Sequence, residues 1–132
     1  MRICIDIDGV ICKLKKKGQS YSELEPMDGA VDKINEIRNN GHYIILYTAR
    51  RMKTHQSNTG KIIKDIGKIT LEWLDKYGIE YDEIYFGKPW ANVYLDDNAL
   101  RFSSWDDISG DGSSFPPSNE SKFLKQKNII KW

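Results

Sequence analysis

Disulfides, a strong net charge and long apolar runs are all missing from this chain. Only 2 of its 132 residues are cysteines, and the spacing of Cys4 and Cys12 is typical neither of a disulfide framework nor of a zinc site. Lysine and arginine number 20 against 19 acidic residues, so the net charge of +1 favours neither nucleic acid nor a membrane surface as a partner. No apolar stretch approaches the roughly 18 residues that a membrane span needs. These absences predict a single soluble, cytoplasmic domain held by a hydrophobic core.

The most informative stretch lies near the start, where a short apolar segment ends in Asp6 and Asp8 and is followed by Gly9. Its continuous apolar character predicts a strand from about Ile3 that is buried on both faces, as in a parallel sheet. Such sheets carry their chemistry at the carboxyl ends of the strands. Two carboxylates this close repel unless a cation or a shared proton compensates, which favours a hard metal ion such as Mg²⁺. The alternative is a solvated turn.

Three later segments also read as strands that end in polar residues. They are Tyr43–Tyr47 followed by Thr48, Glu83–Gly87 followed by Lys88, and Val93–Leu95 followed by Asp96 and Asp97. Phosphoryl transfer requires these groups: a carboxylate that attacks phosphorus, an acid for the leaving oxygen, and a hydroxyl, an ammonium and a metal for the phosphoryl oxygens. The four strand ends together therefore predict a phosphoryl-transfer site.

In this order, the segments IDIDGV, LYTAR, GKP and YLDD resemble the four motifs of the haloacid dehalogenase-like (HAD) phosphohydrolase superfamily. The resemblance covers residues 1–102. The segments NTGK and GKPW are also similar to those of small capless phosphatases found with capsular or surface polysaccharide biosynthesis genes. The resemblance implies an α/β fold: a single Rossmann-like HAD domain with a central parallel sheet flanked by helices and no cap domain.

The same resemblance implies a role for each motif residue. Asp6 would be the nucleophile and Asp8 the general acid and then base, while Thr48 and Lys88 would bind the phosphoryl group. The implied cofactor is Mg²⁺, and the aspartates implied to bind it are Asp6, Asp8, Asp96 and Asp97. The backbone carbonyl of Asp8 is the usual further ligand in this superfamily.

No segment is long enough to form a cap, because residues 9–28 precede the first predicted helix and a single helix fills the second gap. An open site favours a small-molecule substrate with a bulky remainder, such as a phosphorylated sugar or a nucleotide-sugar precursor, or a homo-oligomer in which a neighbouring subunit covers the site. Ala49, Arg50 and Arg51 follow Thr48 and are predicted to contact that remainder, since guanidinium groups suit a second anionic group.

Helical periodicity occupies the gaps between the predicted strands. A helix is expected over residues 29–40 with Asp28 as its N-cap, and a longer one over residues 60–77. Trp73 and Tyr77 could form a ligand platform, but their place in the apolar stripe predicts that they belong to the core. Residues 103–132 form a loop-rich tail packed on the core, whose final docking residues are expected to be Phe123, Leu124, Ile129, Ile130 and Trp132.

The connection between the last two motifs is short. Only seven residues separate Lys88 from Asp96, and eight extended steps span at most about 27 Å. If the third strand lies at one edge and the fourth beyond the first, the chain must cross about three strand spacings of roughly 4.8 Å and also descend and climb again. Either Lys88 then lies below the rim of the sheet, or the third strand is short and displaced.

The sequence also has features in common with proteins of other functions. A phosphoreceiver signalling domain also uses clustered aspartates, a threonine and a lysine, but it places an acidic pair first and the lysine last. In this chain the pair Asp96 and Asp97 comes last, after Lys88. A polynucleotide or protein phosphatase is also compatible with an open site. The chain lacks the basic stripe interleaved with aromatic residues that a polynucleotide substrate favours, so no nucleic acid partner and no membrane partner is expected.

Overall fold

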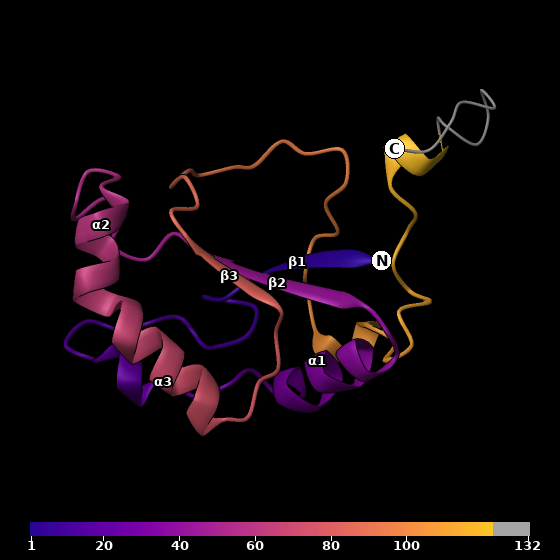
Figure 1. The fold of residues 1–132 in the computed structure, drawn as a ribbon, viewed down its shortest axis with the longest axis horizontal. Coiled ribbons are helices and arrows are strands. Elements are labelled where there is room, and N and C mark those ends of the chain that lie inside the picture. Colours follow the sequence, from indigo (N-terminus) through magenta and orange to yellow (C-terminus); the bar gives the residue numbers. More distant parts are fainter. Residues whose placement is uncertain (123–132) are drawn as a thin grey trace.

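The structure is a computed structural model, and it describes residues 1–122 of the chain. Three parallel strands form one sheet in the order β1-β2-β3, namely β1 (Arg2–Asp6), β2 (Tyr43–Thr48) and β3 (Glu83–Phe86). A helical crossover joins each strand to the next (Figure 1), as parallel pairing requires. The predicted α/β class with a parallel sheet is confirmed.

Helices occur in both crossovers, near the predicted positions. Between β1 and β2 lies α1 (Ala30–Asn39), and between β2 and β3 the chain runs through α2 (Thr59–Ile62), a π-helical turn η2 (Ile63–Gly67) and α3 (Lys68–Lys76). Two 3₁₀ turns complete the set, η1 (Tyr21–Glu23) and η3 (Trp105–Asp107). No helix within residues 1–122 is both long enough and apolar enough to cross a membrane.

The start of α1 differs from the prediction. Its N-cap is Gly29, with a φ of 81° in the left-handed region and no side-chain cap, so the prediction of Asp28 is wrong. Glycine adopts this conformation without a steric penalty, and the chain therefore turns into the helix one residue later than expected. The helix after β2 does have a side-chain cap, since Asn58 accepts a hydrogen bond from the backbone N–H of Lys61.

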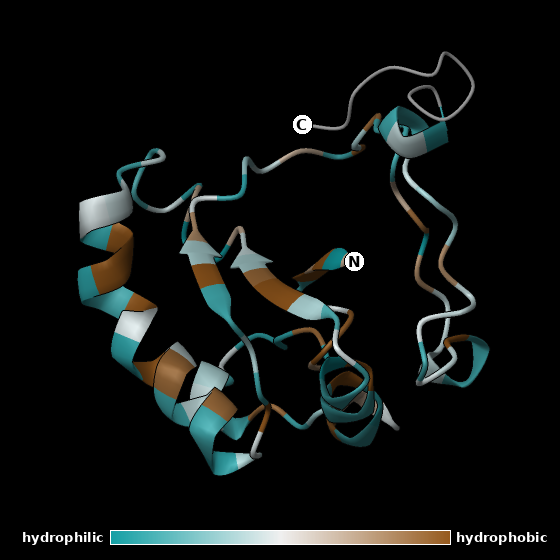
Figure 2. Ribbon diagram, turned by 45° about the vertical axis from the view of Figure 1, so that its right-hand side comes forward, coloured by the Kyte–Doolittle hydropathy of each residue, from teal (hydrophilic) through white to brown (hydrophobic). Residues whose placement is uncertain are grey.

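Both crossover helices pack on one face of the sheet. The core cluster on this face combines residues of the strands, α1 and α3: Ile5, Ile44, Leu46, Ile34, Ile37, Trp73 and Leu74. Figure 2 shows hydrophobic segments on the strands and on α3. The indole N–H of Trp73 donates to the carbonyl of Leu24 at 2.7 Å, so its predicted place in the core is confirmed. The core therefore lies between the sheet and the two helices.

The opposite face of the sheet is much less covered. Cys4 and Tyr85 are exposed there and Tyr47 is half-buried, while the chain after β3 arches over this side of the sheet (Figure 1). The prediction that the first strand is buried on both faces is therefore wrong. The described helices stand on one side only, because α1 and α3 share one core.

The predicted fourth strand does not form in the described structure. Val93 and Leu95 are 71% and 96% exposed and lie outside any strand. The sheet order places β3 at one edge and β1 at the other, so the chain must cross the whole sheet to reach the free edge of β1. The short connection after Lys88 is barely long enough to cross the sheet and then descend beside β1, and in this structure it arches over the sheet without pairing with β1.

Residues that follow Phe102 also join the core. Trp105 and Ile108 are buried with the strands and α1, and the indole N–H of Trp105 donates to the carbonyl of Val10 at 2.7 Å. The described part of the predicted tail thus packs on residues 1–102. The five predicted docking residues lie outside the described residues.

We expect Trp105→Ala to lower the free energy of unfolding by about 3–5 kcal/mol, because it removes a buried indole together with its hydrogen bond. Trp90→Ala removes the same side chain from an exposed position and should cost less than about 1 kcal/mol. Chemical denaturation of both variants measures the difference. Equal, small losses would mean that the chain beyond Phe102 does not belong to the core.

Candidate active site

Three of the predicted site residues lie where the three strands end. Asp6 is the last residue of β1, Thr48 is the last of β2, and Lys88 follows β3 by two residues. The backbone N–H of Lys88 donates to the carbonyl of Thr48 at 3.1 Å, which ties the end of β3 to the end of β2. Parallel strands bring their carboxyl ends to one edge of the sheet, and the sequence prediction that these residues lie together agrees with this geometry.

The Asp6 carboxylate forms an ion pair with Lys88. The Nζ to Oδ2 distance is 3.1 Å, and the Lys88 side chain is only 9% exposed. Burial raises the pKa of the Asp6 carboxyl, although the hydrogen bond and charge of Lys88 act in the opposite direction. Burial acts to lower the pKa of the Lys88 ammonium, but Asp6 outweighs it and the pKa of Lys88 is raised. The rings of Tyr47 and Tyr94 lie 4.5 and 4.2 Å from the ammonium, so Lys88 is held charged over Asp6.

Asp8 has a cation of its own. The Nε of Arg50 lies 3.0 Å from both carboxylate oxygens of Asp8, and Nη2 lies 3.0 Å from Oδ1. The hydroxyl of Thr48 donates to Oδ2 at 3.0 Å. Both oxygens of Asp8 are thus engaged by residues from the end of β2. Each carboxylate of the Asp-x-Asp pair therefore has its own side-chain cation, Lys88 for Asp6 and Arg50 for Asp8. These cations offset the repulsion between the two carboxylates.

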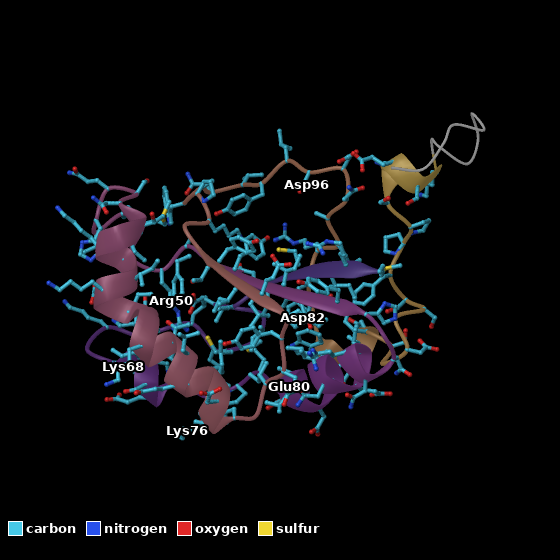
Figure 3. The ribbon with its side chains drawn as sticks, in the orientation of Figure 1. Arg50, Lys68, Lys76, Glu80, Asp82 and Asp96 are labelled. Atoms are coloured by element: carbon cyan, nitrogen blue, oxygen red, sulfur yellow. The ribbon has the colours of Figure 1, made fainter. Side chains whose placement is uncertain are left out.

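Arg50 is buried rather than facing a substrate. It is 3% exposed, and its remaining donors reach the Thr70 hydroxyl on α3 at 3.0 Å and the Cys12 sulfur at 3.4 Å. The guanidinium also lies over the ring of Tyr21, 4.2 Å from its centroid. Figure 3 shows Arg50 between the sheet and the long helical stretch. The N–H groups of its guanidinium are therefore already hydrogen-bonded inside the protein and are not available for the predicted substrate contact.

The other predicted substrate contacts lie beside this cluster. Arg51 lies near the Asp65 carboxylate, with Nε 3.4 Å from Oδ2, and Asp65 also contacts His55 at 2.8 Å. Ala49 is partly buried against a small cluster of Met52, Ile62 and Ile66. Thr48 is fully buried, and its hydroxyl accepts from the backbone N–H of Arg50 while donating to Asp8.

The second acidic pair does not join the site. Asp96 accepts a hydrogen bond from the backbone N–H of Asn98, and Asp97 accepts one from the side chain of Asn119. Both aspartates are exposed on the segment that arches over the sheet, where Figure 3 labels Asp96. Within residues 1–122, no three Asp, Glu, His or Cys side chains converge on a point that could hold a metal. The predicted oxygen set for Mg²⁺ is thus split, because the fourth strand that would carry half of it is not formed.

Sequence reasoning missed three neighbours of Arg50, namely Cys12, Tyr21 and Thr70. Thr70 follows Ile66 by four positions and precedes Trp73 by three, so its place on the inward stripe of the helix is a signal that was available. Burial and the Asp8 carboxylate raise the pKa of the Cys12 thiol to about 12. The thiol therefore stays protonated and lies 3.5 Å from Oδ1 of Asp8 as a weak donor. No signal in the sequence pairs Tyr21 with Arg50.

With this geometry in place, the chain is an α/β protein with two ion-paired carboxylates at the carboxyl edge of a parallel sheet. It belongs to the same family as an MCSG target from Vibrio cholerae, whose crystal structure it matches at 30% identity and a TM-score of 0.70. The match covers 96% of this chain and 98% of that chain. The similarity shows the family and the fold, and function has to be argued from the site.

The chain also matches, more weakly, one chain in the structure of a Pnkp1/Rnl/Hen1 complex, at 22% identity and a TM-score of 0.46. It covers 74% of this chain and 30% of that chain. No family model matches the chain, and no curated protein matches it.

We expect Arg50→Met to lower the free energy of unfolding by about 3 kcal/mol, because it leaves Asp8 without the buried cation that balances it. Arg51→Met removes a half-exposed guanidinium from the neighbouring position and should cost less than about 1 kcal/mol. Urea denaturation measures both. The double variant Arg50→Met with Asp8→Asn should be destabilised by less than the sum of the two single changes. An additive double variant would show that the ion pair contributes nothing of its own.

Proposed function

We propose that this protein is a HAD-type phosphatase, a Mg²⁺-dependent phosphoric monoester hydrolase that works through an aspartyl phosphate on Asp6. The observation that carries the proposal is the contact between Asp6 and Lys88 at the carboxyl edge of the sheet, beside Thr48 and Asp8. A carboxylate at such an edge is placed to act as a nucleophile, and the lysine supplies positive charge where phosphoryl oxygens would lie. The resemblance of the four sequence motifs supports the same chemistry.

In the proposed reaction, a carboxylate oxygen of Asp6 attacks phosphorus as the bond from phosphorus to the leaving oxygen breaks. A proton goes to that oxygen, and the alcohol leaves. Water then attacks the aspartyl phosphate, which releases inorganic phosphate and restores the carboxylate. Asp8 is our candidate for the proton donor and then the base. This role requires it to turn from Arg50 and Thr48 towards the substrate, because both of its oxygens are engaged in the structure.

The metal part of the proposal depends on a rearrangement. Asp6 and Asp8 are together, whereas Asp96 and Asp97 lie apart from them, so the four aspartates do not form one oxygen site in the described arrangement. We propose that Val93–Leu95 adds to the sheet along the free edge of β1 and brings the second acidic pair to the first. Bound there, Mg²⁺ would supply positive charge for the phosphoryl oxygens. A parallel strand added beside β1 also gives the exposed side chains of this segment a place to pack.

The proposed substrate is a phosphorylated sugar or a small alcohol phosphate, carried on a glycan or nucleotide-sugar precursor of surface polysaccharide biosynthesis. It rests on the capless chain and on the resemblance to polysaccharide-associated phosphatases. The structure gives one reason to revise the contacts expected for it. Arg50 is buried and committed to Asp8, so its guanidinium does not reach a second anionic group. Arg51 lies beside Asp65 at the neighbouring position.

Asp6→Asn should abolish hydrolysis of p-nitrophenyl phosphate, since an amide cannot form the acyl phosphate, while Asp75→Asn on the exposed side of α3 should leave it unchanged. Wild-type activity should disappear with EDTA and return with Mg²⁺. Mass spectrometry of protein quenched in acid should find a phosphoryl group on Asp6 only in the wild type. Substantial Mg²⁺-dependent turnover by the Asp6→Asn variant would refute the nucleophile. If phosphoproteins or 3′-phosphorylated oligonucleotides outranked every sugar phosphate in kcat/KM, the substrate would be wrong and the chemistry would stand.

The proposed strand addition fixes a register that can be tested with the exposed Cys4 of β1. If Asp96 lies beside Asp6 in parallel pairing, Tyr94 lies beside Cys4, because both residues come two positions earlier on the same face. Mild oxidation of Tyr94→Cys should then form a disulfide with Cys4, and Mg²⁺ should speed its formation. Val93→Cys faces the other side of the added strand and should not crosslink, nor should Tyr94→Cys combined with Cys4→Ser. Equal crosslinking of both positions, or none, would rule out this register.

A further inference from the structure

An open groove of about 570 Å³ lies beside the candidate active site. One wall is made by the loop between β2 and α2, with Met52, Lys53, Gln56 and Ser57, and the other by the residues around Pro89 and Trp90. This volume is within the range of small-molecule sites, about 300–1,000 Å³.

The residues that line the groove neighbour the candidate active site along the chain, although Asp6, Asp8, Thr48 and Lys88 are not among them. Its first wall begins four residues after Thr48, and its second wall contains Gly87 and Pro89, which flank Lys88. Gly87 and Lys88 both donate backbone hydrogen bonds to the carbonyl of Thr48. A phosphoryl group placed over Asp6 and Lys88 would therefore have its remaining substituent close to the groove.

The loop that forms the first wall has a strained backbone conformation. Arg51, Gln56 and Ser57 have φ values of 62°, 51° and 65°, in the left-handed region that residues other than glycine rarely adopt. The backbone N–H of Ser57 donates to the carbonyl of Met52 at 2.9 Å and so closes the loop. Strain of this kind persists only where the surrounding structure enforces it, and it clusters at functional sites. The wall is thus a defined surface rather than a loose connection.

The two walls approach each other at Gly87. A Cβ built on this glycine would lie 2.9 Å from the Thr59 side chain, and its φ of 109° is one that only glycine adopts readily. Glycine therefore sets the width of the groove at its inner end, where the groove meets Lys88.

The groove combines a cation, an aromatic face and neutral polar groups. The ammonium of Lys53 lies 4.3 Å from the centroid of the Trp90 ring, which is 52% exposed. Gln56, Ser57 and Thr59 add an amide and two hydroxyls, and no acidic side chain lines the groove. Lys53 lines the groove, whereas the arginines of the same loop, Arg50 and Arg51, do not.

From these features, we infer that the groove binds the leaving group of the substrate, and that this leaving group is a sugar ring carrying a second anionic group, a carboxylate or a phosphate. The inference rests on the proposed phosphatase function. The ring packs on Trp90, its hydroxyls meet the amide and hydroxyl side chains, and Lys53 pairs with the second anion. A nucleobase would also stack on an exposed aromatic ring, so it is the alternative occupant that the test has to separate from a sugar.

The test compares three esters: glycerol 3-phosphate, fructose 6-phosphate and fructose 1,6-bisphosphate. The wild type should rank them in that rising order of kcat/KM. Lys53→Met should lower the ratio of kcat/KM for the bisphosphate to that for the monophosphate about tenfold, since it removes one charged hydrogen bond. Trp90→Ala should lower the ratio of fructose 6-phosphate to glycerol 3-phosphate, and Trp90→Phe should restore most of it. Lys76→Met removes a similar lysine from an aromatic ring, that of Tyr77 directly after α3, and should change neither ratio.

The outcomes separate this inference from the proposed function. Hydrolysis of all three esters with ratios that Lys53→Met and Trp90→Ala leave unchanged would overturn the groove and leave the phosphatase standing. A preference for adenosine 5′-monophosphate over the bisphosphate would also overturn it, in favour of a base. If no ester is hydrolysed and no aspartyl phosphate forms on Asp6, the proposed function falls and the inference falls with it.

Discussion

The buried guanidinium of Arg50 is the group on which the arrangement of the site depends. It reaches residues from three parts of the chain: Asp8 after β1, Cys12 and Tyr21 in the following loop, and Thr70 on α3. A charge that is 3% exposed has lost most of its hydration, and only a complete set of partners offsets that cost. The loop after β1 and the helix after β2 are therefore held to the end of β2 by one side chain.

This constraint changes how the Asp-x-Asp motif is understood. From the sequence alone, two neighbouring carboxylates favour a hard metal ion, because their repulsion has to be compensated by a cation or a shared proton. In the structure each has its own cation, Lys88 for Asp6 and Arg50 for Asp8. The two pairs differ in character, because Lys88 stands at the rim beside two tyrosine rings whereas Arg50 is inside the fold. The ion pair of Asp6 thus lies at the rim of the sheet, whereas the ion pair of Asp8 is part of the interior.

The sequence predicts well what depends on local pattern. The three strands and both helical stretches follow from apolar runs and helical periodicity, and they are found near their predicted bounds. The burial of Trp73 follows from the same stripe. What depends on the path of the chain in space is predicted badly. Val93–Leu95 has the apolar character of a strand, but pairing also needs a partner edge within reach, and the sheet order puts that edge on the far side. Arg50 has the charge of a ligand contact, and only the fold shows that its partners are internal.

The π-helical turn in the long helical stretch has a consequence for how that stretch meets the rest of the molecule. An α-helix advances by about 100° per residue, so a single wider turn shifts the angular phase of everything after it. Before the turn, Ile62 packs with Met52 under the loop that follows β2; after it, Thr70, Trp73 and Leu74 face Arg50 and the main core. The apolar side of this helical stretch packs first against the loop after β2 and then against the main core, because its direction changes at the π-helical turn. The π-helical turn thus lets one helical stretch pack against both the loop that lines the groove and the interior of the domain.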